Sequence, residues 1–293
     1  MTIVTTAALW GASSAAAAGL QQGYVPWPNA LPGRTVGPAA PPHSVPGCRS
    51  LQLGCVDRLI VRLRREWRAD NSTCSHRAIF SLGYLRISSE IRRRLAHHET
   101  FDHPAWFISV VQGFSDEYFA TQRRYDAGKS VPGSWRIYYD AMRHGDYNAG
   151  QDLLLASNAH TNHDLPYAYA ASGLLTKSGV SRKHDHDQVN DVNASVFSGL
   201  AGYYAAHYDP LFTTISATSP VPQLSTLQLI QTWRENAWRE AERLVAAKTP
   251  AELQQVEQQI ETTSTAWAKL ITSGAEPGYR ATRDAYCQAH HAG

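Results

Sequence analysis

The chain contains 293 residues, of which 43% are hydrophobic and 18% are charged, and its formal net charge is +2. This composition is ordinary for a globular protein with a substantial core. The near-neutral balance and the scattered basic residues exclude the continuous basic surface of a nucleic-acid-binding protein. No apolar run reaches the length of a membrane span, so we expect none.

The N-terminus differs from the rest of the chain. Residues 1–19 are small, apolar and uncharged, and they end in four alanines and a glycine. They resemble the hydrophobic region and cleavage site of a secretory signal, although they lack its basic start. We therefore expect a signal-like leader over 1–19 and a secreted or extracytoplasmic protein, with a disordered Ala-rich leader as the alternative.

Residues 20–46 are rich in proline, and residues 47–293 are expected to form a single domain. Seven of the prolines stand at positions 26, 28, 32, 38, 41, 42 and 45. Because proline cannot occupy a helix interior, this segment is predicted to be an extended linker or an arm that lies on the domain surface.

The four cysteines are Cys48, Cys55, Cys74 and Cys287. An even number of cysteines in an exported protein favours disulfides, and three pairings are open. We predict Cys48–Cys55 and Cys74–Cys287, with four free thiols in a cytosolic protein as the alternative. Zinc coordination by these cysteines is disfavoured because no Cys-x-x-Cys spacing occurs.

From residue 47 onward, apolar residues recur at helical spacing. Val56, Leu59, Ile60, Leu63 and Trp67 form one apolar stripe with arginines opposite, which predicts the first helix. Further helices are predicted over about 75–96 and 104–128, from 134, from 148, from 189 to just before 210, and over about 225–248. A capping box, Thr249-Pro250-Ala251-Glu252, predicts where the last helix begins. The expected fold is all-α, a single bundle of about eight or nine helices with a Pro-rich N-terminal arm.

The stretch 158–190 concentrates imidazole and carboxylate groups in two clusters. In the first, His160, His163 and Asp164 stand at i, i+3 and i+4, so that on a helix they project from one side. Pro166 then removes a helical hydrogen bond and disturbs the turn that carries them. The alternative is a buried polar network in which Asn158, Asn162 and Asp164 bridge helices.

The second cluster contains His184, Asp185, His186 and Asp187 at the expected N-terminus of a helix, where carboxylates are favoured by the dipole and can cap free amides, which is the simplest role for Asp185. Imidazole and carboxylate are the ligands that zinc and iron prefer. We predict a divalent metal, zinc first and iron as the alternative. The predicted ligands are His160, His163, Asp164 and His184, the predicted catalytic residues are His160, Asp164 and Asp185, and the predicted supporting residues are Asn158, Asn162, Asn190 and His76.

Four segments resemble a family of uncharacterised proteins that is frequent in actinobacteria. They are Cys74-x-His76-x-Ala78-Ile79-Phe80, Tyr84-Leu85-Arg86-Ile87-Ser88, Leu153-Leu154 through Asn158-Ala159-His160-x-Asn162-x-Asp164-Leu165, and Asp185-x-x-x-Val189-Asn190. The resemblance covers most of Cys48–Val245 and implies a helical domain with no known activity. His160, Asn162, Asp164, Asp185 and Asn190 match the family pattern, whereas His163 and His186 stand at positions that the pattern leaves open.

Two functions follow from these features. The first is a secreted metal-dependent enzyme, most simply a hydrolase, in which the metal lowers the pKa of a bound water. The second is a non-catalytic ligand-binding or structural protein whose helices, rich in tryptophan and tyrosine, line a pocket for an apolar or sugar ligand. The chain has no Gly-x-Ser-x-Gly elbow, Walker loop or dinucleotide fingerprint, which argues against enzymes built on those motifs.

Overall fold

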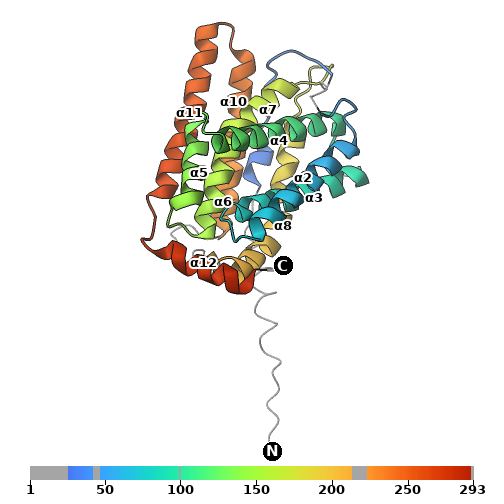
Figure 1. The fold of residues 1–293 in the computed structure, drawn as a ribbon. Coiled ribbons are helices and arrows are strands. Elements are labelled where there is room, and N and C mark those ends of the chain that lie inside the picture. Colours follow the sequence, from blue (N-terminus) through green and yellow to red (C-terminus); the bar gives the residue numbers. More distant parts are fainter. Residues whose placement is uncertain (1–25, 42–46, 99, 213–222, 292–293) are drawn as a thin grey trace, which may run out of the picture.

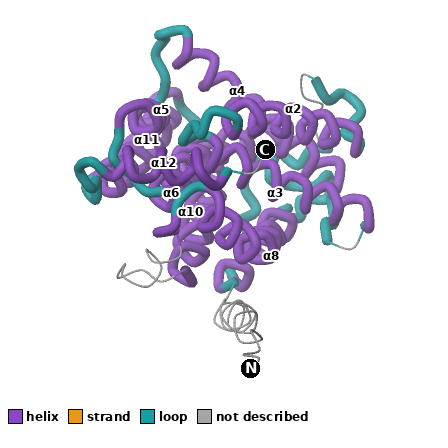
Figure 2. The backbone as a smooth tube through the Cα atoms, turned by 60° about the horizontal axis from the view of Figure 1, so that its bottom comes forward, coloured by secondary structure: helices purple, strands orange, loops and turns teal. Residues whose placement is uncertain are grey.

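The fold is all-α, as predicted. The computed structural model describes residues 26–41, 47–98, 100–212 and 223–291 (Figure 1). Within these residues there are ten α-helices and no strand (Figure 2). The predicted leader over 1–19 lies outside the described residues.

Most helices begin and end close to the predicted positions. They are α2 (Leu53–Asn71), α3 (Ala78–His97), α4 (Pro104–Asp126), α5 (Gly133–His144), α6 (Ala149–Asn158), the π-helical η2 (Ala159–Asp164), α7 (Leu165–Ser172), α8 (Lys183–His207), α10 (Gln223–Ala246), α11 (Pro250–Thr272) and α12 (Tyr279–His290), with 3₁₀ turns η1 (Trp27–Ala30) and η3 (Pro210–Phe212).

The C-terminal end differs from the expectation of one last helix. α11 begins with the predicted capping box, in which Thr249 and Glu252 satisfy each other's backbone amides. It ends at Thr272, and α12 starts only at Tyr279 after Gly278, whose φ is +83°. Glycine adopts this left-handed conformation without steric cost, so the chain turns here and begins a separate helix. α12 lies across the end of the bundle (Figure 1).

A central helical rod organises the bundle. α6, η2 and α7 follow one another without a loop, and α3, α4, α5, α10 and α11 all contact this rod. α10 and α11 form an antiparallel pair beside it (Figure 1). A helix surrounded in this way buries its polar side chains as well as its apolar ones, which places the first His/Asp cluster in the interior.

The described part of the Pro-rich segment is an arm that packs on α8 and α10. Pro28 is buried, and its carbonyl accepts a hydrogen bond from Lys183 Nζ at 2.9 Å. Further along the arm, the Pro32 carbonyl accepts from Arg239, and the Arg34 amide donates to Glu242. The arm therefore lies on the domain instead of extending away from it.

Both predicted disulfides are present. Cys48 pairs with Cys55 across seven residues, and Cys74 pairs with Cys287 across 213 residues. The second bond joins the segment before α3 to α12. Among the described residues, no helix combines the length and the apolarity needed to cross a bilayer.

Candidate functional site

Asp164 is the centre of the first cluster. Its carboxylate is buried and accepts hydrogen bonds from Trp135 Nε1, from His160 Nδ1 at 2.9 Å and from His163 Nδ1 at 2.8 Å. Burial raises the pKa of Asp164, but the hydrogen bonds from the two histidines outweigh burial and hold that pKa below its usual value. Asp164 is therefore an ionised acceptor that orients both imidazoles.

His160 is held as a neutral ring. Burial lowers its pKa, and the neighbouring Asp164 carboxylate offsets this only in part. Because Nδ1 faces a carboxylate, the proton of the neutral ring sits on Nδ1, and Nε2 keeps its lone pair. Nε2 is buried and has no hydrogen-bond partner among the described residues. The ring stacks on Phe114, with centroids 3.3 Å apart.

His163 differs from His160 in its second nitrogen. Its Nε2 lies 3.4 Å from Glu261 of α11, and Glu261 also accepts the backbone amide of Gly133. Burial would lower the pKa of His163, but the hydrogen bonds to Asp164 and Glu261 outweigh burial and raise it to about 9. His163 is therefore a cation that joins the central rod to α11 and, through Glu261, to α5.

The asparagines form the bridging network that was the alternative to a metal site. Asn158 donates to the Ser264 carbonyl of α11 and accepts from Asn162, and the Asn162 carbonyl oxygen lies 3.5 Å from Asn236 Nδ2 of α10. These bonds satisfy polar groups inside the bundle. Their chief effect is to fix the central rod against α10 and α11.

A partly open apolar cavity lies beside His160 and is lined by residues of α3, α4, the central rod, α8 and α10. About 120 Å³ of it is open to the centres of water molecules. That space is smaller than the ~300–1,000 Å³ of sites for drug-sized ligands, so it suits a small or slender apolar group. Its walls include Ile87, Ile91, Val110, Phe114, Val196 and Leu200.

Most residues that line this cavity are apolar, and the polar ones include Ser88, His160 and Arg234. Ser88 is 1% exposed, and its Oγ has no hydrogen-bond partner among the described residues, like His160 Nε2. Arg234 of α10 is the only charged side chain among the described lining residues. Buried polar atoms are nearly always hydrogen-bonded, so unpaired ones on one cavity mark a place for a ligand or for water.

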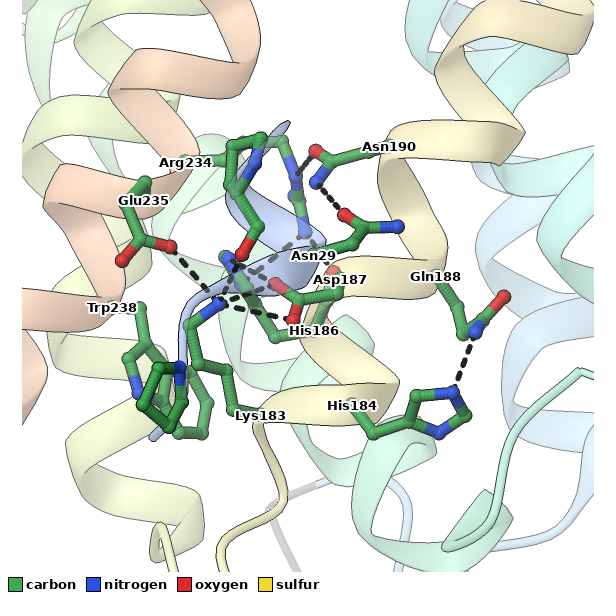
Figure 3. A network of polar contacts seen from close by, with 12 residues as sticks. Asn29, Lys183, His184, His186, Asp187, Gln188, Asn190, Arg234, Glu235 and Trp238 are labelled. Atoms are coloured by element: carbon green, nitrogen blue, oxygen red, sulfur yellow. Dashed lines mark hydrogen bonds and ion pairs between the residues drawn. The ribbon is translucent and has the colours of Figure 1, made fainter. Parts of the chain in front are cut away.

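The second cluster lies elsewhere. Asp185 accepts the backbone amides of Asp102 and His103, so it holds the segment just before α4 and does not cap its own helix. His184 is exposed and bonds to Asp102 and Gln188 (Figure 3). Neither residue makes a hydrogen bond to the Asp164 group.

Groups of potential metal ligands occur at three places in the described residues, with ligand atoms within 4.8 Å of one another. They are Cys74 with Cys287 and His291, Asp102 with His103 and Asp185, and His186 with Asp187 and Glu235. The two cysteines of the first group are consumed by their disulfide. None of the groups contains His160, His163, Asp164 or His184.

His76 belongs to a third polar cluster beside the Cys74–Cys287 disulfide. Its Nε2 lies 2.9 Å from Asp284, and its Nδ1 faces Asp152 and Arg283. Arg283 in turn pairs with Asp152. His76 therefore joins α12 to the bundle, and these contacts are enough to explain a histidine at this position.

Asn190, a predicted supporting residue, belongs to a buried network with Arg234, which was not predicted (Figure 3). Its side-chain oxygen accepts from Arg234 Nε at 3.0 Å, and its amide donates to Asn29 of the arm. A signal for Arg234 was present, because Leu227, Ile230 and Arg234 stand at i, i+3 and i+7. A charged residue on an apolar stripe is either paired in the interior or functional.

Comparison with known proteins identifies a family but no activity. Residues 56–274 match a protein-family model described as a family of unknown function (DUF5995). No curated protein matches the chain. No solved structure matches it either.

Proposed function

The chain belongs to DUF5995, a family of unknown function, and we propose that it binds an apolar small molecule in the cavity beside His160. One observation carries this proposal: an apolar cavity whose lining contains buried polar atoms without partners, His160 Nε2 and Ser88 Oγ. Apolar walls with a few fixed polar groups are typical of small-molecule sites.

The polar atoms select the kind of group that the ligand presents. Since His160 Nε2 carries a lone pair, it accepts a hydrogen bond from a ligand hydroxyl or amide. The Ser88 hydroxyl both donates and accepts. A ligand that satisfies these atoms removes the cost of leaving them unpaired, ~1–3 kcal/mol for each group.

The test is a fluorescence titration of the full chain with N-phenyl-1-naphthylamine, an apolar probe. We expect saturable binding with one site per chain. Val110 is buried and lines the cavity, so Val110→Phe fills the site and should weaken binding at least tenfold. Val61, which is 62% exposed on α2, provides the matched control, because Val61→Phe leaves the cavity unchanged.

Two results would contradict the proposal. One is the absence of saturable binding by the folded wild type. The other is equal binding by the Val110→Phe and Val61→Phe variants, which would place the probe elsewhere. Far-UV circular dichroism and thermal melts of each variant exclude unfolding as the cause of lost binding.

A metal-dependent hydrolase is the second candidate, and the His160–Asp164 pair favours it. A carboxylate that binds one ring nitrogen of a histidine orients the other nitrogen toward a metal. His163 has both ring nitrogens directed at carboxylates. Zinc or iron here would therefore be held by His160 Nε2 and would need ligands other than the predicted set.

Metal analysis separates the two candidates. Stoichiometric zinc or iron in the purified protein that is lost in His160→Ala would support the enzyme. A metal-free wild type that binds the probe would leave ligand binding as the function. For either candidate we propose a secreted protein, supported by the two disulfides, because such bonds persist in oxidising compartments.

A further inference from the structure

Among the described residues, the hydrogen bonds of Arg234 all go to neutral groups, although its side chain is buried and the residue is only 6% exposed. Its guanidinium donates to Asn190 Oδ1 at 3.0 Å and to the His186 carbonyl at 2.5 Å, and Tyr169 Oη lies 3.5 Å away. No carboxylate of the described residues lies within 4.0 Å of the Arg234 guanidinium, which is the longest distance for an ion pair. An arginine stays protonated in a protein, so this is a buried cation without a direct counter-ion.

The nearby carboxylates are already paired with other cations. Lys183 Nζ lies 2.8 Å from Asp187 and 3.0 Å from Glu235, and Glu235 also pairs with Arg239 at 2.7 Å (Figure 3). Lys183 and Arg239 balance Asp187 and Glu235, so these pairs leave the charge of Arg234 without a direct partner. What distinguishes Arg234 is its position, because it is the charged member that reaches the cavity wall.

His186 is a neutral, buried neighbour that helps to hold Arg234 in place. His186 Nδ1 is 2.7 Å from the Tyr169 hydroxyl and 3.3 Å from Arg234 Nη2. Burial lowers the pKa of His186 well below its usual value, and the charges of Arg234 and Lys183 lower it further. The ring therefore accepts hydrogen bonds without adding charge, and the guanidinium is held in place before any ligand arrives.

Resting on the proposed function, we infer that the cavity takes an apolar acid whose carboxylate pairs with Arg234. Nε and Nη2 of the guanidinium already donate to Asn190 and His186, so the ligand carboxylate accepts a charge-assisted hydrogen bond from the remaining nitrogen, Nη1. A phosphate monoester also accepts such a bond, but it carries up to two negative charges, and only one cation of the described residues lines the cavity. The apolar walls hold the chain of the acid, and His160 and Ser88 are available to polar substituents on it.

The experiment is isothermal titration calorimetry of the full chain with three probes of equal chain length: decanoate, 1-decanol and decylammonium. We expect the wild type to bind decanoate at least tenfold more tightly than 1-decanol and decylammonium more weakly than both. Arg234→Gln should bind decanoate no better than 1-decanol while its affinity for 1-decanol changes less than threefold. Arg243 on the same helix pairs with Glu240 and does not line the cavity, so Arg243→Gln is the control for loss of charge.

The outcomes separate this inference from the proposed function. If the wild type binds 1-decanol as tightly as decanoate, the acid is wrong and the cavity function stands. If it binds none of the three probes, the cavity function itself fails. A preference for decanoate that survives in Arg234→Gln would remove Arg234 as the partner. If Arg234→Gln does not fold, Arg234→Lys replaces it, because lysine keeps the positive charge. We expect Arg234→Lys to retain the preference for decanoate. An Arg234→Lys protein that binds decanoate no better than 1-decanol would overturn the inference.

Discussion

At the scale of single residues, one carboxylate holds two histidines in opposite protonation states. His160 and His163 both bond to Asp164, yet the pKa of His160 is lowered and that of His163 is raised to about 9. The difference lies in the second nitrogen of each ring. His163 meets a second acid, Glu261, whereas His160 is surrounded by aromatic rings and its Nε2 has no hydrogen-bond partner in the part of the chain that the structure describes. Residue identity and spacing alone do not distinguish these environments.

The raised pKa of His163 predicts a pH-dependent stability. Because the folded pKa of about 9 lies above the unfolded value near 6.5, the stabilisation is complete below pH ~6.5. It is lost as the pH rises through about 9, and it amounts to at most ~3 kcal/mol. Chemical denaturation between pH 6 and pH 10 should show this fall in the wild type and a smaller one in His163→Gln.

The control for this measurement is the exposed His144. His144→Gln should leave the difference in stability between pH 6 and pH 10 as it is in the wild type. A His163→Gln protein with the same pH dependence as the wild type would show that His163 is not a cation in the folded state.

At the scale of elements, the central rod contains a π-helical turn at the place where the sequence predicted that Pro166 disturbs the helix. Pro166 has no backbone N–H, so a regular α-helix cannot continue through it without losing a hydrogen bond. The π turn Ala159–Asp164 directly precedes this position. Single π turns within α-helices are frequent at functional sites, which agrees with the position of His160 on the cavity wall.

α11 supports the central rod, and its start is fixed locally. It supplies Glu261 to His163 and the Ser264 carbonyl to Asn158. Its first turn is closed by the Thr249 side chain, which accepts from the Glu252 amide at 3.2 Å. The capping box thus sets where α11 begins. The start of the helix in turn determines which of its residues, such as Glu261 and Ser264, face the central rod.

Removing this cap should destabilise the protein measurably. We expect Thr249→Ala to lower the free energy of unfolding by ~1 kcal/mol, because an amide of the first turn loses its acceptor. Thr262 is exposed in the middle of α11, and Thr262→Ala should not lower stability. Urea denaturation checks both. Equal losses in the two variants would mean that the capping box does not stabilise α11.

At the scale of the whole molecule, the two disulfides differ in how much of the chain they close. Cys74–Cys287 spans 213 residues and Cys48–Cys55 spans seven. In the chain-entropy account, a bond restricts the unfolded chain more when its loop is longer, which gives ~5 kcal/mol for the first and ~2 kcal/mol for the second. The long-range bond also keeps α12 and the His76 cluster on the bundle.

This difference predicts the order of stabilities of two variants. Replacing Cys74 and Cys287 with serine should lower the denaturation midpoint more than replacing Cys48 and Cys55. Denaturant titrations under non-reducing conditions measure both. If the two double variants unfold at the same midpoint, strain or residual structure outweighs loop length, and the entropy account does not hold for this protein.

The sequence by itself determined the helical class, most helix boundaries, the start of α11 and the expectation that the four cysteines pair, whereas the structure decided which of the three pairings forms. The features that the sequence determined follow from local rules: the periodicity of apolar residues, the chemistry of caps, and the tendency of an even set of cysteines to pair. The sequence also placed His160, His163 and Asp164 together, because residues three and four apart share a helix face. The family match over 56–274 agrees with the expected uncharacterised family.

The tertiary structure alone decided which polar groups meet and where space is left. His184 and Asp185 lie with Asp102 and His103, and His76 lies with Asp284 of α12, across sequence separations of 82 or more. Helical periodicity tells which side chains face inward, but it does not tell which helices face one another. The cavity and the buried Arg234 arise where five segments fail to fill the space between them, and that depends on the packing of all five at once.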